Sequence, residues 1–290
     1  MQKSELKKIA ITLICTMLGL LMPDVFLWTF ATINVLTIGI IHGANDLYIL
    51  LKSSKTAKKT HFAYLFVSYV LFVLTMIFAL QNIPQWAILL FVLISAYHFG
   101  EQQWHTYQIN SSINIYLFYT VYGAFLFALL FYTHLVQTIT IINEITNITI
   151  SEQVFSFVLL LSMVLVLIFT ALNFKQLKGQ LLFQFFALCS ITLLFTQTSL
   201  LWSFSVYFVL WHSIPSLNDQ ANELFANKPN PIKSFIQLAL PYWILAMLGF
   251  GLALFYLKDN MDTFITIFFS FLAAITIPHV FVIFRMHQNK

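Results

Sequence analysis

Long apolar runs, separated by short polar connectors, constrain this chain more than any other feature of its sequence. The hydrocarbon core of a bilayer is about 30 Å thick and is spanned by roughly 20 apolar residues of helix. Only helices and closed barrels satisfy their backbone polar groups there, and the continuous runs lack the alternation of barrel strands. Charged residues make up only 8% of the chain, against about 25% in an average soluble protein. We therefore predict an all-α fold, a polytopic transmembrane helix bundle.

The number of spans follows from the apolar segments. Ten can be marked, at residues 9–22, 25–48, 62–80, 85–104, 113–134, 154–172, 181–198, 200–217, 236–257 and 263–284. The first is short for a span, and residues 181–217 fit either a hairpin or one long bent helix, so we expect eight to ten spans. At residues 137–151 we expect a longer polar loop, either irregular throughout or containing an interfacial element. Because no repeat or linker interrupts the chain, we expect a single integral-membrane domain over residues 1–290.

Positive charge predicts the orientation. With ten crossings and the N-terminus in the cytoplasm, all 14 Lys and Arg residues except Lys258 fall on the cytoplasmic side. This is the positive-inside pattern, and it places both termini in the cytoplasm. It also accounts for the net charge of +4 without a nucleic-acid partner. The lysines before Ile9 imitate a secretory signal, but no small-residue cleavage site follows, so we expect an uncleaved first span in the cell inner (cytoplasmic) membrane.

Four histidines occupy equivalent places in their segments. His42, His98, His212 and His279 each lie late in a span that runs from outside to inside, and should therefore reach a similar depth. Any one of them alone fits a hydrogen-bonded core histidine, but four at one level need a reason, because burying an imidazole without a partner is costly. A metal ion supplies that partner, and an all-nitrogen Fe²⁺ site fits the residues nearby. The other histidines fall at or beyond span ends and are expected to be solvated or interfacial: His61, His105, His134 and His287.

Carboxylates stand close to two of these histidines in the sequence. Asp46 follows His42 by four residues and Glu101 follows His98 by three, which places each pair on one face of a helix. Metal-bound histidines usually donate their second ring nitrogen to such a group. We therefore expect Asp46 to orient His42 and Glu101 to orient His98. The alternative for each carboxylate is a charge at a helix end.

Aromatic residues flank two of the proposed ligands. Tyr97 and Phe99 stand on either side of His98, and Trp211 directly precedes His212. Most of the 32 phenylalanines must face lipid or pack between helices. We predict that Tyr97, Phe99 and Trp211 belong to the minority that lines a slot for a long apolar substrate.

Four short stretches resemble the signature blocks of the Brp/Blh family of integral-membrane β-carotene 15,15'-dioxygenases: Ile41–Asp46, Tyr97–Glu101, Trp211–Ser213 and Pro278–His279. They occur in the family's order and span most of the chain. The resemblance implies an Fe²⁺-dependent enzyme that uses O₂ to cleave the central double bond of β-carotene. The products would be two molecules of all-trans-retinal, supplied to a rhodopsin.

One position departs from that family. Its members commonly have a second histidine four residues after the one that His212 matches, and here that position is Ser216. Either His279 completes a four-histidine site, or three histidines and a water hold the iron. Because Pro278 frees the backbone before His279 to turn inward, we predict that His279 supplies the fourth imidazole. Ser216 would then lie beside the metal without binding it.

Two other classes of protein fit the same histidines without the resemblance. A haem-binding membrane electron carrier would use them as axial ligands and would show a Soret band. A proton-coupled transporter would use them as relays and would show pH-dependent flux without a bound metal. The resemblance favours the dioxygenase, in which the metal carries the O₂ chemistry and the protein places one double bond.

Overall fold

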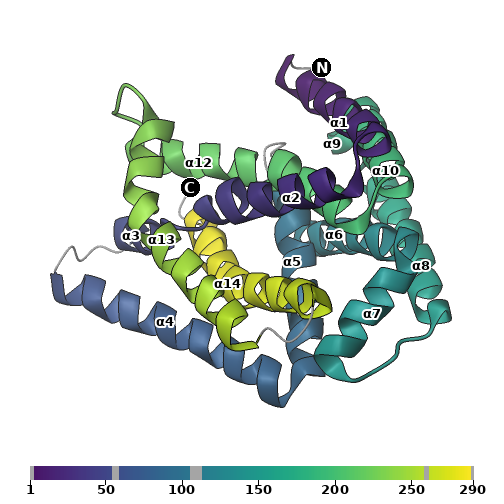
Figure 1. The fold of residues 1–290 in the computed structure, drawn as a ribbon. Coiled ribbons are helices and arrows are strands. Elements are labelled where there is room, and N and C mark those ends of the chain that lie inside the picture. The colour runs from purple at the N-terminus through teal and green to yellow at the C-terminus, as the bar shows by residue number, and fades with distance from the viewer. Residues whose placement is uncertain (1–2, 54–58, 105–112, 258–260, 289–290) are drawn as a thin grey trace. The chain divides into compact units, whose positions relative to one another are not determined.

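The computed structural model describes residues 3–53, 59–104, 113–257 and 261–288, and every element within these ranges is helical (Figure 1). The predicted all-α fold is confirmed. Within these ranges, six helices are long and apolar enough to cross a membrane: Phe62–Asn82, Ile115–Thr133, Glu152–Leu172, Leu200–Phe225, Pro231–Tyr256 and Phe264–Gln288. Asp24–Gly39 and Leu181–Gln197 form shorter apolar helices. The count of eight to ten spans and the cytoplasmic termini stay predictions, and Lys258 lies outside the described residues.

The chain divides into two compact units, each assembled from three separate stretches. The first unit contains Met1–Thr37, Ala96–Thr140 and Thr149–Pro215, and the second contains Ile38–Ser95, Ile141–Ile148 and Ser216–Lys290. The prediction of a single integral-membrane domain stays a prediction. One short helix, α7 (Leu135–Thr146), has residues in both units.

Helices of the first unit pack in pairs. The unit holds α1 (Lys3–Leu21), α2 (Asp24–Asn34), the end of α5 (Pro84–Trp104), α6 (Ile113–Thr133), α8 (Glu152–Leu172), α9 (Phe174–Leu177), α10 (Leu181–Gln197), α11 (Leu200–Tyr207) and the π-helix η3 (Phe208–Ser213). α6 packs along α8 and α1 along α10 (Figure 1), and α11 packs along α2. The indole of Trp202 donates to the carbonyl of Cys15 at 2.9 Å. Such bonds satisfy polar groups that lipid would leave without a partner.

Glycines let α5 and α6 meet backbone to backbone. A Cβ atom added at Gly123 would lie 1.8 Å from the carbonyl oxygen of Ala96, and one at Gly100 would lie 1.9 Å from that of Tyr119. No side chain fits at such distances, and small residues are typical of close approaches between membrane helices. This packing fixes the end of α5, which carries His98.

The second unit is organised around α14. It holds α3 (Asp46–Ser53), α4 (Lys59–Asn82), most of α12 (Ile214–Phe225), α13 (Pro231–Leu257) and α14 (Met261–Gln288). α14 packs against α3, α4 and α13, and α3 also packs against α4. A buried apolar cluster joins α3 to α14, with the ring of Tyr69 from α4 packed on it; its members are Ile49, Val282, Ile283 and Met286. Three helices therefore share one core.

The apolar segment 25–48 is not one helix. α2 ends at Asn34, and the chain continues as the π-helix η1 (Val35–Gly39). A turn at residues 42–45 then precedes α3, which begins at Asp46. The backbone N–H groups of Gly43 and Ala44 bond carbonyls three residues back, both at 3.1 Å. Hydropathy does not reveal this break, because the run from Val25 to His42 is almost continuously apolar.

Two further segments resolve choices that the sequence left open. Residues 181–217 form a hairpin, since Thr198 and Ser199 are extended and separate α10 from α11. The segment expected as a loop at 137–151 is largely helical, because α7 covers Leu135–Thr146 and ends at Asn147, whose φ is 57°. Asparagine tolerates this left-handed conformation and commonly ends helices.

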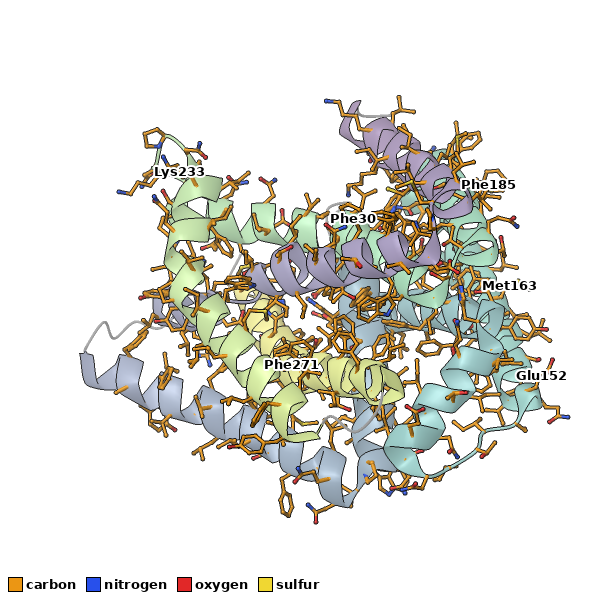
Figure 2. The ribbon with its side chains drawn as sticks, in the orientation of Figure 1. Phe30, Glu152, Met163, Phe185, Lys233 and Phe271 are labelled. Carbon is orange, nitrogen blue, oxygen red and sulfur yellow. The ribbon has the colours of Figure 1, made fainter. Side chains whose placement is uncertain are left out.

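Large apolar side chains cover the outer faces of several helices. Phe30 of α2, Met163 of α8 and Phe185 of α10 are exposed by 51%, 40% and 61% (Figure 2). The charged residues Glu152 and Lys233 lie instead near the starts of α8 and α13. Apolar flanks with charged ends suit helices that are surrounded by lipid.

We expect Gly123→Ala to destabilise the first unit by about 1–3 kcal/mol, because the added methyl overlaps the Ala96 carbonyl and forces the helices apart. Thermal unfolding in detergent measures the loss. Gly249→Ala in α13 is the matched control, since its Cβ would meet nothing within 4 Å. That variant should be neutral or slightly stabilising, because alanine favours a helix by about 1 kcal/mol over glycine. Equal melting temperatures for the two variants would contradict the close packing.

Candidate metal centre

In the second unit, Asp46 pairs with His279. Its Oδ1 lies 2.7 Å from Nδ1 of His279, although the two residues are 233 positions apart in the chain. Its Oδ2 accepts a hydrogen bond from the hydroxyl of Tyr69 at 2.8 Å. Asp46 and His279 are 2% and 4% exposed. A carboxylate buried this deeply is stable only with such hydrogen-bond donors. Asp46 of α3 therefore requires its partners on α4 and α14 to stay in place.

Asp46 was expected to orient His42, but in the structure the ring of His42 is hydrogen-bonded to the backbone carbonyl of Gly39 instead. Nδ1 is the ring nitrogen that makes this short hydrogen bond. The expectation assumed a regular helix from His42 to Asp46, whereas these residues are separated by the turn at 42–45. The turn removes the four-residue register and directs the Asp46 carboxylate toward α14.

His42 and His279 nevertheless lie together. Their ring centroids are 4.8 Å apart and the rings are nearly perpendicular, at 88°. Gly43 makes room for this arrangement, since a Cβ there would lie 3.2 Å from Nδ1 of His279. In each neutral ring, Nδ1 carries the hydrogen that its oxygen acceptor requires, so the lone pair is on Nε2. A metal-binding histidine usually has this form, with one ring nitrogen donating to an oxygen and the other free to bind the metal.

The first unit contains a second pair. The rings of His98 and His212 have centroids 4.6 Å apart and an interplanar angle of 76°. Both residues are buried, at 1% and 2% exposure. Phe99 stacks on His212 with a centroid distance of 4.2 Å and an angle of 8°, and Phe208 lies nearly parallel to it at 5.6 Å. The predicted substrate-lining residue Phe99 thus orients a proposed ligand.

A π-helix carries His212. Residues Phe208–Ser213 form η3, and the hydroxyl of Ser213 donates to the carbonyl of Phe208, five residues back, at 2.9 Å. The N–H of Ile214 likewise bonds the carbonyl of Val209. π-helical turns are rare and often occur at functional sites. A second π-helix, η1, ends at Gly39, three residues before the proposed ligand His42.

Glu101 lies near His98, as its spacing predicted. Its Oε2 is 4.0 Å from Nδ1 of His98, beyond a hydrogen bond, and its Oε1 accepts one from the hydroxyl of Tyr97 at 2.8 Å. Ser216 is buried in α12, where its hydroxyl accepts a hydrogen bond from the side-chain amide of Gln220 at 3.0 Å. The roles of Glu101, Tyr97 and Ser216 at a metal or substrate site stay predictions.

Trp211 points to α1. Its indole N–H donates to the hydroxyl of Thr12 at 2.9 Å, and its ring stacks on Phe183 of α10 with centroids 6.3 Å apart. These contacts join α1, α10 and η3 and anchor the turn that carries His212. A substrate-lining role for Trp211 stays a prediction.

The remaining histidines differ from one another. His134, which was expected to be solvated or interfacial, is half-buried, with ring nitrogens 3.0 Å from the carbonyl oxygen of Leu130 and 2.8 Å from that of Thr198. His287 is half-buried near the end of α14. The side chain of His61 and all of His105 lie outside the residues that the structure describes.

The donor set suits a transition-metal ion. Neutral imidazoles are nitrogen donors of the kind that Fe, Cu, Zn and Ni accept, and each buried pair offers two of them. The buried Asp46 carboxylate brings a negative charge to His279, and a cation on Nε2 of that ring would balance it.

Sequence reasoning missed Tyr69, which is an ordinary tyrosine within an apolar run, and no local signal marks it.

The family model described as beta-carotene 15,15'-dioxygenase matches residues 33–287 of the chain. The matched region includes both histidine pairs together with Asp46 and Tyr69. No curated protein and no solved structure matches the chain.

We expect Trp211→Phe to lower stability by about 0.5–1.5 kcal/mol, because it removes the hydrogen bond to Thr12 while keeping an aromatic ring. If Trp211 also lines the substrate slot, as the sequence predicts, the KM for an apolar substrate should rise as well. Unfolding in detergent and steady-state kinetics measure the two quantities. Lower stability at an unchanged KM would limit Trp211 to its contacts with α1 and α10.

Proposed function

Since the chain belongs to the β-carotene 15,15'-dioxygenase family, we propose that it cleaves the central 15,15' double bond of β-carotene with O₂ in an Fe²⁺-dependent reaction. The products are two molecules of all-trans-retinal. The observation that carries the proposal is the presence of two buried histidine pairs, His42 with His279 and His98 with His212, within the region that matches the family.

We propose that these four histidines hold one Fe²⁺. Neutral imidazoles suit this ion, and the hydrogen bonds at Nδ1 of His42 and His279 favour the tautomer in which Nε2 binds a metal. Bound iron would supply the O₂ activation that side chains cannot perform. Asp46 and Glu101 orient the ligands, and Ser216 lies beside the iron without binding it.

The protein's own contribution is placement and exclusion of water. Phe99 stacks on the ring of His212, and Phe208 lies nearly parallel to both rings, so this side of the site is apolar and suits a polyene. We propose that Phe99, with Tyr97, lines the channel that places the central double bond. Excluding water at this point protects the reaction from side reactions.

The proposed setting is the cell inner (cytoplasmic) membrane. The exposed apolar helices suit a multi-pass protein that takes β-carotene directly from lipid. Both termini would lie in the cytoplasm, by the distribution of positive charge. Retinal would pass to a rhodopsin, and no nucleic acid takes part.

Expression in cells that accumulate β-carotene tests the activity. Orange cells should become pale, and extracted pigment should contain retinal. Alanine at any one of the four histidines should remove retinal formation without preventing membrane insertion. His287→Ala, on the same helix as His279, is the control and should keep activity. Cells that stay orange with well-inserted wild-type protein would refute the function, and a Soret band in the purified protein would indicate haem instead.

The fourth ligand has its own test. We expect His279→Ala to lose most of the bound iron, because it removes the imidazole that Asp46 orients. Ser216→Ala should keep iron near the wild-type content, since it removes only the acceptor of the Gln220 amide. Iron per protein is measured on purified samples by elemental analysis. Loss of iron in the serine variant alone would reverse the assignment.

A further inference from the structure

We propose that Tyr69 is a positioning residue for the metal site: through Asp46, it holds the ring of His279 in the orientation and tautomer that offer Nε2 to the iron. The inference rests on the proposed function and adds a residue that lies 23 positions from Asp46 in sequence. It makes three helices, α3, α4 and α14, jointly responsible for one ligand.

Both oxygens of the Asp46 carboxylate are used. Oδ1 lies 2.7 Å from Nδ1 of His279, and Oδ2 accepts from the Tyr69 hydroxyl at 2.8 Å. A carboxylate held at one oxygen can rotate about its own bond, whereas one held at both has a fixed plane. The hydroxyl of Tyr69 therefore sets the direction from which Oδ1 meets the imidazole. The bond from His279 to the carboxylate raises the basicity of that ring, and the bond from Tyr69 fixes the direction of the carboxylate.

Tyr69 is itself fixed. Its ring packs on the apolar cluster of Ile49, Val282 and Ile283. Val282 and Ile283 follow His279 by three and four residues, which is about one turn of α14. The rigid ring and the ligand thus rest on the same helix. In the turn before α3, Gly43 leaves space for the imidazole of His279, since a Cβ atom at Gly43 would lie 3.2 Å from Nδ1 of that ring. Packing and hydrogen bonding therefore select one position for His279.

His42 provides the internal contrast. Its Nδ1 is bonded to the backbone carbonyl of Gly39, a neutral acceptor. His279 is bonded to a carboxylate, which makes its Nε2 the more electron-rich donor of the pair. Removing the Tyr69 hydroxyl frees the Asp46 carboxylate to rotate, and it should therefore weaken metal binding through His279 and leave the support of His42 unchanged.

A purely structural role for the Tyr69–Asp46 bond is the competing explanation. Asp46 is the first residue of α3, and its carboxylate could serve only to join α3 to α4. That role predicts a lower melting temperature for Tyr69→Phe with unchanged metal affinity. The positioning role predicts weaker affinity and an altered spectrum of the bound metal.

The experiment uses the purified full chain in detergent, stripped of metal and titrated with Co²⁺, whose d–d absorption reports ligand geometry. Tyr69→Phe should weaken Co²⁺ binding about 10-fold and shift the d–d bands, and Asp46→Asn should weaken it about 10–100-fold. The double variant should bind no more weakly than Asp46→Asn alone, because both substitutions interrupt the same connection.

Two variants serve as controls. Tyr64→Phe changes an exposed tyrosine on the same helix and should leave binding unchanged. Ile49→Val loosens the cluster on which Tyr69 packs and leaves Asp46 unchanged. It therefore controls for any effect on Co²⁺ binding that comes only from lower stability. If Tyr69→Phe binds Co²⁺ like wild type, or if Ile49→Val weakens binding equally, the positioning role is overturned. Wild-type protein that binds Co²⁺ through His279 but leaves β-carotene intact would refute the proposed function alone.

Discussion

The buried carboxylate of Asp46 is the constraint on which the second unit depends. A charged group inside an apolar bundle is stable only when its oxygens are hydrogen-bonded, and here both partners come from other helices. Satisfying this one side chain fixes α3, α4 and α14 against each other. The apolar cluster beside it adds van der Waals packing between the helices, which is a main source of association between helices in a membrane.

The first unit reaches a buried histidine pair by other means. Its proposed ligands are oriented by ring stacking and by close backbone packing. Phe99 and Phe208 lie nearly parallel to His212, and Gly100 and Gly123 let α5 and α6 approach closely. Aromatic surroundings exclude water and suit a polyene, whereas the carboxylate in the second unit suits a cation. The proposed function gives each environment a use, an apolar substrate for the first and a metal ion for the second.

Much of the fold was predictable, because apolar runs of this length have few alternatives to helices. The choice of His42, His98, His212 and His279 also followed from their places in those runs, and the structure brings them together as two pairs. The partner of Asp46 was not predictable. It depends on a turn and a π-helix that hydropathy does not encode, and on His279, 233 residues away. Tyr69 escaped for the same reason, since only tertiary packing distinguishes it from other tyrosines.

The hydrogen bond of His42 to a main-chain carbonyl has a consequence for how such a site can change over generations. No substitution deletes a backbone oxygen, so the orientation of His42 tolerates sequence drift as long as the π-helical turn survives. His279 depends on two side chains from two other helices, and each can be lost by a single codon change. We therefore expect positions 46, 69 and 279 to change together or not at all among related chains.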